Sequence, residues 1–130
     1  MKNIYVIGVG LIGGSLALDI KQQNKEVTIY GIDNNASHLD EALKLNVIDE
    51  KSELNDIANA DLVILSIPVD ASVKVISNIL DLVSDNALVV DVGSTKSDIC
   101  KAVAAHPKRR NFLAMHPIAG TEFSGPKAAI

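Results

Sequence analysis

Three glycines near the N-terminus have the spacing of a phosphate-binding turn. Gly8, Gly10 and Gly13 form the pattern G-x-G-x-x-G, directly after an apolar run and at the start of a segment with helical spacing. In that setting the first glycine permits a tight turn, the second lets the backbone approach a pyrophosphate, and the third allows a helix to pack closely on a strand. The free N–H groups of Leu11 and Ile12 at the helix start would point at the negative charge. The pattern therefore predicts a dinucleotide site.

An acidic residue after the second apolar run indicates which dinucleotide is bound. Asp33 follows Gly13 at the spacing of about 20 residues at which a carboxylate can accept hydrogen bonds from the adenosine ribose. It would repel a 2′-phosphate, and Asn34 and Asn35 carry no positive charge to accommodate one. NAD is therefore favoured over NADP. The alternative interpretation is a structural glycine turn with a surface aspartate.

A serine and a histidine follow two later apolar runs. The run Ala87 to Val92 is followed closely by Ser94, and the run Phe112 to Met115 leads directly into His116. Oxidation of an alcohol by NAD removes a hydride and a proton, and a histidine that titrates near neutrality is the usual proton acceptor. Ser94 could hydrogen-bond the ring nitrogen that faces away from the substrate. The alternative is a loop histidine that caps a strand end.

These residues need a scaffold, and the apolar pattern predicts one. Runs without polar alternation indicate strands buried on both faces, and they occur at Ile4 to Val9, Val27 to Ile32, Leu62 to Ile67, Ala87 to Val92 and Phe112 to Met115. Segments with helical spacing separate the first four runs and follow the fourth, and their start signals are Ser37, Asp70, and Ser94 or Thr95. The order predicts an α/β fold, a doubly wound and mostly parallel sheet with helices on both faces.

Ligands bind such sheets at the carboxyl ends of the strands, where the strand order reverses. The third run ends there in Ser66 and Pro68, and both are candidate cofactor contacts. Residues 47–60 are less regular and are interpreted as a short strand and a brief helix.

The remaining reactive side chains have plainer interpretations. We expect His38 and His106 to be surface residues and residues 108–110 to form a solvated basic turn. Cys100 falls in a helical stripe and is interpreted as a small core residue.

Composition narrows the class of protein. The chain has 130 residues, which suits one domain, and a formal net charge of −4, which offers no electrostatic footprint for nucleic acid or an anionic membrane. A single cysteine fits a reducing compartment. Glycines interrupt the N-terminal apolar run, and no small-residue cleavage site follows it. We expect a cytoplasmic protein without a metal site.

The motifs taken in series resemble those of one enzyme family. GVGLIGGSLA, GID, ADLVILSIPV, VVDVGSTKSDI and HPIAGTEFSGP occur in this order in the nucleotide-binding half of prephenate dehydrogenases and the related arogenate dehydrogenases. The first motif is common to many dinucleotide enzymes, whereas the last two are much more specific. The resemblance implies a Rossmann-type NAD-binding domain over residues 1–130.

The resemblance also implies residue roles. His116 would be the catalytic base and Ser94 its hydrogen-bond partner, while Thr121 and Glu122 would line the substrate pocket. The reaction would be oxidative decarboxylation of prephenate to 4-hydroxyphenylpyruvate, on the way to tyrosine.

Family members continue into a helical domain that dimerises and supplies an arginine for the substrate carboxylate, and these 130 residues do not include it. A homodimer is therefore implied for the full-length protein only. We expect the 130-residue chain to bind NAD, to turn over prephenate negligibly, and to self-associate through the apolar surface that the helical domain would cover.

Three alternatives remain open. One is arogenate as substrate. Another is a different Rossmann dehydrogenase, such as a β-hydroxyacid dehydrogenase or an imine reductase, although these usually place the catalytic residue elsewhere. The third is a non-catalytic NAD-binding module, which would need Gly10 and Asp33 but not Ser94 and His116.

Overall fold

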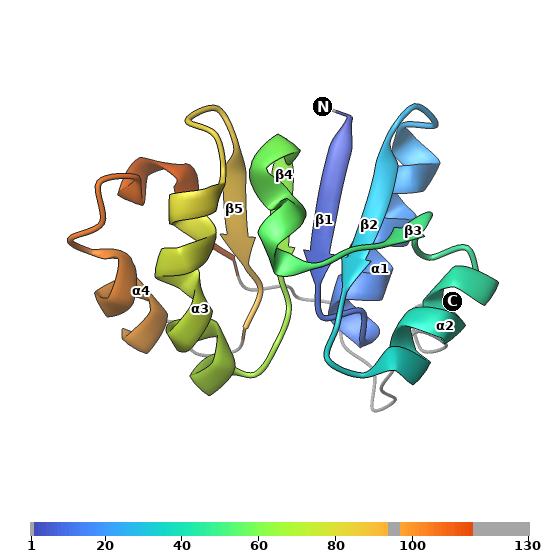
Figure 1. Ribbon diagram of the computed structural model, residues 1–130, viewed down its shortest axis with the longest axis horizontal. Coiled ribbons are helices and arrows are strands. Elements are labelled where there is room, and N and C mark those ends of the chain that lie inside the picture. The colour runs from blue at the N-terminus through green and yellow to red at the C-terminus, as the bar shows by residue number, and fades with distance from the viewer. Residues whose placement is uncertain (1, 94–96, 116–130) are drawn as a thin grey trace.

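The chain folds around a six-stranded sheet in which neighbouring strands are parallel. The computed structural model describes residues 2–93 and 97–115. The strands are β1 (Asn3–Ile7), β2 (Thr28–Ile32), β3 (Glu50–Lys51), β4 (Leu62–Leu65), β5 (Leu88–Asp91) and β6 (Phe112–Ala114). The helices are α1 (Leu11–Gln23), α2 (Ala36–Lys44), α3 (Val69–Leu82) and α4 (Ser97–Val103), with 3-10 turns η1 (Leu54–Asn59) and η2 (Arg109–Asn111). The strand order is β3-β2-β1-β4-β5-β6 (Figure 1), which confirms the Rossmann-type prediction.

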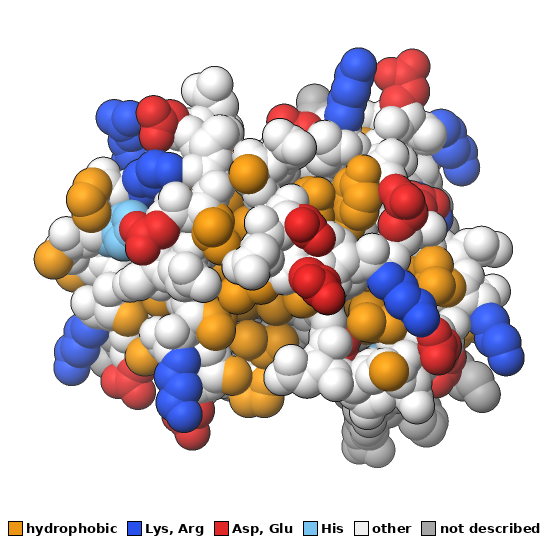
Figure 2. All heavy atoms as spheres, in the orientation of Figure 1, with side chains coloured by type: hydrophobic (Ala, Val, Ile, Leu, Met, Phe, Trp, Pro, Cys, Tyr) orange, Lys and Arg blue, Asp and Glu red, His pale blue; other side chains and the backbone are white. Residues whose placement is uncertain are grey.

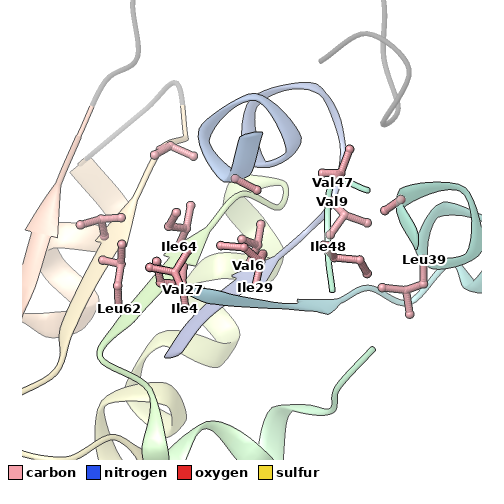
Figure 3. Packing of buried hydrophobic residues seen from close by; sticks show 14 residues of the cluster. Ile4, Val6, Val9, Val27, Ile29, Leu39, Val47, Ile48, Leu62 and Ile64 are labelled. Atoms are coloured by element: carbon pink, nitrogen blue, oxygen red, sulfur yellow. The ribbon is translucent and has the colours of Figure 1, made fainter. Parts of the chain in front are cut away.

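Alternate residues of the central strands point to opposite faces, and different helices cover the two faces. Ile4 and Val6 of β1 pack with residues of α1 and α2, as the close view shows (Figure 3). Tyr5 and Ile7 lie in a second cluster with residues of α3 and α4. Figure 1 shows α1 behind the sheet and α3 in front of it. Both faces of β1 are therefore buried, and this is why its sequence shows no polar alternation.

The chain leaves the two central strands on opposite faces. After β1 it turns into α1, and after β4 it turns into α3, while β1 and β4 pair directly with Ile7 opposite Leu65. In doubly wound sheets, ligands bind at the carboxyl ends of the strands where the chain diverges in this way.

Two predicted helix starts are wrong by one or two residues. The cap of α2 is Asn35, whose side-chain oxygen accepts hydrogen bonds from the backbone N–H groups of Ser37 and His38. Ser37 itself lies inside the helix. The residue before α3 is Pro68, and Asp70 lies in the first turn. A proline before the helix and an acid within its first turn both suit a helix N-terminus. The start of α4 adjoins residues 94–96, so Ser94 and Thr95 as caps lie outside the described residues.

The less regular segment contains the short elements that the sequence predicts. β3 is a two-residue strand paired with β2, and η1 is a 3-10 turn with Ile57 buried. Lys51 of β3 also pairs with Asp40 of α2.

The prediction that Cys100 is a core residue is wrong, because its side chain is exposed. Ile99 and Val103 form the buried stripe of α4. Cys100 follows Ile99 by one position, about 100° around the helix, which turns it away from the sheet.

None of the helices within residues 2–93 and 97–115 is both long and apolar enough to cross a bilayer.

Candidate functional site

The first glycine of the turn after β1 has a conformation and a location that no other residue suits. Gly8 has a φ of +92°, and its N–H donates to the carbonyl oxygen of Ile32, 2.7 Å away. A Cβ atom built on Gly8 would lie 2.2 Å from the backbone oxygen of Ser66. The turn is thus wedged between the ends of β2 and β4. Ser66 therefore packs against the glycine turn through its backbone oxygen.

The third glycine brings α1 close to this turn. A Cβ atom on Gly13 would lie 2.2 Å from the backbone oxygen of Gly8 and 3.0 Å from Cγ1 of Val6. The first turn of α1 therefore approaches the turn and β1 as closely as backbone atoms permit. The predicted role of Gly13 in helix packing agrees with this geometry.

The second glycine faces open space. Gly10 precedes α1 as its cap and supplies no side-chain hydrogen bond to the helix start. A Cβ atom on Gly10 would meet no atom of residues 2–93 and 97–115 within 4 Å. The first N–H groups of a helix have no partner within the helix, and together with the helix dipole they attract anions. The space in front of Gly10, Leu11 and Ile12 is therefore suited to a phosphate group.

Asp33 is fixed beside the glycine turn at the end of β2. Its Oδ2 accepts the backbone N–H of Val9 at 3.1 Å, and its Oδ1 accepts the N–H of Asn35 at 2.8 Å. The side chain is 14% exposed. The carboxylate keeps further lone pairs for a ligand. Sequence reasoning did not predict the hydrogen bond from the Val9 N–H, through which Asp33 also stabilises the glycine turn.

His38 lies next to this carboxylate. Its Nδ1 is 3.7 Å from Oδ2 of Asp33, and its side chain is 41% exposed. The exposure agrees with a surface residue, but the interpretation as a plain one misses the neighbour. This neighbour depends on Asn35 capping α2, whereas Ser37 was the predicted cap, so sequence reasoning missed it.

A small apolar pocket adjoins Asp33 on the face of α3. Its volume is about 150 Å³. The lining residues come from the ends of β1 and β2, from η1, from the segment between β4 and α3, and from α3 itself, and they are Ile7, Ile32, Asp33, Asn34, Leu54, Ile67, Ala71 and Val75. In Figure 2 apolar side chains gather between α3 and β2 on the lower part of the face in view. The pocket can hold a flat, mostly apolar ring beside the polar edge that Asp33 provides.

Pro68 lies at the far side of this region. It precedes α3, and its carbonyl oxygen accepts the N–H of Ser72 at 2.9 Å. Neither Pro68 nor Ser66 lines the small pocket. Their contact with a cofactor remains a prediction.

The proposed catalytic residues follow two strands that end side by side. The N–H of Met115 donates to the carbonyl oxygen of Asp91 at 2.7 Å, and Asp91 pairs with Ala114 across β5 and β6. The Asp91 side chain is buried. Ser94, His116, Thr121 and Glu122 lie outside the described residues, and their roles remain predictions.

The interpretation of His106 as a surface residue is wrong. Its side chain is 10% exposed, and its Nε2 lies 2.8 Å from Oδ1 of Asp81. Its Nδ1 accepts the backbone N–H of Lys108 at 2.9 Å, so the neutral ring donates from Nε2. Lys108 in turn bonds the carbonyl oxygen of Val83. These contacts tie the chain after α4 to the end of α3, far from the glycine turn in sequence and at the opposite ends of the strands.

Comparison with known proteins places the chain in a family. The sequence model described as "Prephenate dehydrogenase, nucleotide-binding domain" matches residues 16–130. The chain is 37% identical over 133 residues to the prephenate dehydrogenase of Lactococcus lactis subsp. cremoris (strain MG1363), which covers 99% of this chain and 37% of that protein.

Two solved structures share the fold. Prephenate dehydrogenase from A. aeolicus, in complex with hydroxyphenyl propionate and NAD⁺, is 32% identical with a TM-score of 0.82, over 98% of this chain and 45% of that one. Synechocystis arogenate dehydrogenase is 29% identical with a TM-score of 0.81, over 98% of this chain and 45% of that one. The chain spans less than half the length of each of these three relatives.

Proposed function

The chain belongs to the prephenate dehydrogenase family as a nucleotide-binding domain, and we propose that it binds NAD for an enzyme that oxidises prephenate. The observation that carries this proposal is the space in front of Gly10, which no described residue fills, at a start of α1 that has no side-chain cap hydrogen bond. A pyrophosphate would fit there against backbone N–H groups. The relative from A. aeolicus was solved with NAD⁺, which supports the choice of cofactor.

The surroundings of Asp33 support NAD rather than NADP. Two backbone N–H groups hold this carboxylate at the end of β2, so it is positioned to accept hydrogen bonds from the ribose hydroxyls. A 2′-phosphate would bring at least one negative charge against it. The apolar pocket next to Asp33 would take the adenine ring.

The chemistry would follow the family. When bound, the nicotinamide ring would accept a hydride from the substrate. His116 would accept the proton of the ring hydroxyl of prephenate, and Ser94 would orient the imidazole. Loss of carbon dioxide then makes the substrate ring aromatic. Thr121 and Glu122 would contact the substrate. Arogenate could undergo the same steps, because its ring carries the same hydroxyl and carboxylate.

Calorimetric titration of the chain with NAD⁺ and with NADP⁺ tests the cofactor. We expect NAD⁺ to bind about tenfold more tightly or better, the ratio that about 1.4 kcal/mol of charge repulsion produces. Asp33→Asn keeps the shape of the side chain and removes its charge. In this variant the difference in affinity between NAD⁺ and NADP⁺ should be smaller. Equal binding of the two dinucleotides by the unchanged chain would refute the assigned role of Asp33.

The catalytic assignment needs the whole enzyme. His116→Asn in the longer protein should reduce kcat for prephenate by about 100-fold or more, the usual scale of general-base catalysis, with little effect on NAD⁺ affinity. Unchanged turnover would show that another group accepts the proton.

A further inference from the structure

His38 lies at the place where NAD and NADP differ. The ring Nδ1 is 3.7 Å from Oδ2 of Asp33, the carboxylate that would face the 2′ position of the ribose. The backbone N–H of His38 donates to the Asn35 side chain at 3.3 Å, which fixes the residue on the first turn of α2. The His38 ring is more exposed than the Asp33 carboxylate, so it lies on the solvent side of it.

Within the described residues, the charged groups near α2 leave Asp33 as the main charged neighbour of the imidazole. The strands packed against α2 are β2 and β3. β2 is followed by Asp33, while β3 consists of Glu50 and Lys51, and Lys51 is paired with Asp40 of α2 itself. The other charged residues of α2 are Glu41 and Lys44 in its later turns. Residues 8–15 carry no charged side chain.

We propose that His38 is a specificity-determining residue that sets, together with Asp33, how strongly a 2′-phosphate is rejected. This inference rests on the proposed function. A neutral imidazole leaves the Asp33 carboxylate with its full charge, and NADP is excluded. A protonated imidazole offsets that charge and offers a cation to the phosphate, so discrimination weakens. Histidine is the side chain whose charge changes between about pH 5 and 8, which makes the preference for NAD dependent on pH.

The test is the ratio of the two dissociation constants, NADP⁺ over NAD⁺, measured by calorimetry from pH 8 to pH 5.5. NAD⁺ serves as the internal reference for folding at each pH. The 2′-phosphate itself gains a proton near pH 6, so the ratio will fall with pH even where residue 38 is uncharged. His38→Gln isolates the remaining effect, because glutamine can hydrogen-bond but cannot become charged.

We expect the ratio to fall about three- to fivefold further in the unchanged chain than in His38→Gln, the scale of interactions between partly exposed charges. His38→Arg carries a permanent cation, and its ratio should already be low at pH 8. Glu41→Gln, on a later turn of the same helix, is the matched control and should follow the unchanged chain.

The outcomes separate this inference from the proposed function. If both dinucleotides bind, and the ratio follows the same pH curve in the unchanged chain and in His38→Gln, NAD binding stands and the role of His38 is refuted. If neither dinucleotide binds at any pH, both proposals fail.

Discussion

Gly10→Ala should weaken dinucleotide binding without disturbing the fold. A methyl group at Gly10 would meet no atom of the described part of the chain within 4 Å, and the backbone there is extended, with φ −80° and ψ −153°. Alanine is a poorer helix cap than glycine, but it restricts the unfolded chain, which stabilises by about 0.4–1 kcal/mol. These effects oppose each other, so the free energy of unfolding should change by no more than about 0.5 kcal/mol.

The effect on binding should be much larger. The methyl group would occupy the space in which the pyrophosphate must approach the start of α1. Loss of one hydrogen bond to a charged group costs about 1.5–3 kcal/mol, which corresponds to about 10- to 150-fold in the NAD⁺ dissociation constant.

Gly13→Ala is the matched contrast. Its methyl group would lie 2.2 Å from the Gly8 backbone oxygen, and such overpacking costs about 1–3 kcal/mol or more. The midpoint of thermal unfolding should fall by roughly 4 °C for each kcal/mol.

Thermal unfolding and calorimetry on Gly10→Ala, Gly13→Ala and the unchanged chain separate the two roles. If Gly10→Ala binds NAD⁺ as tightly as the unchanged chain, the phosphate does not lie where this account puts it. If Gly13→Ala is as stable as the unchanged chain, the close packing of α1 on the turn is not required.

Three further predictions concern stability. Asn35→Ala removes the cap of α2 and should lower the free energy of unfolding, measured in urea, by about 1 kcal/mol. Asn35→Asp should retain most of that stability. An unchanged urea midpoint in Asn35→Ala would contradict the capping role. Backbone N–H groups, first that of Asn3 and then that of Lys2, lower the pKa of Asp61 below its ordinary value of 3.8. Because the folded pKa is the lower one, the charge stabilises the fold above about pH 4 and ceases to do so as the pH falls through the folded pKa. The difference in melting temperature between Asp61→Asn and the unchanged chain should thus shrink as the pH falls below about 4, and a difference independent of pH would contradict it. His106→Ala removes two hydrogen bonds of a mostly buried ring and should lower the free energy of unfolding by about 1–3 kcal/mol. Asp81→Ala should lower it by under about 1 kcal/mol, because that partner is exposed. Equal effects of the two variants would show that the hydrogen bond from the Lys108 N–H to His106 is not the main contribution.

The alternation of apolar runs and helical segments was enough to predict the fold. Each central strand is buried on both faces, so its apolar run is continuous, and the glycine pattern locates the first turn. A short strand and a brief helix could be predicted within residues 47–60, but not their bounds, because β3 consists of the exposed residues Glu50 and Lys51.

Contacts between distant residues could not be predicted. His106 is buried by partners on α3 and in its own loop, and no local pattern indicates that α3 ends beside it. The bond from Val9 to Asp33 depends on the ends of β1 and β2 meeting, and the neighbourhood of Asp33 and His38 depends on whether Asn35 or Ser37 caps α2. Asn35 rather than Ser37 is the cap, and that choice brings His38 to the carboxylate.

Titration of the isotope-labelled chain with NAD⁺, followed by the chemical shifts of its backbone amides, tests the central claim most directly. We predict saturable shifts centred on Val9, Gly10, Leu11 and Ile12 and on the amide of Asn35, which donates to Asp33, with little change in the groove between α3 and α4 near Lys74 and Lys101. No saturable shift at millimolar NAD⁺, or shifts centred on that groove, would contradict the assignment of the glycine turn and Asp33 as the dinucleotide site.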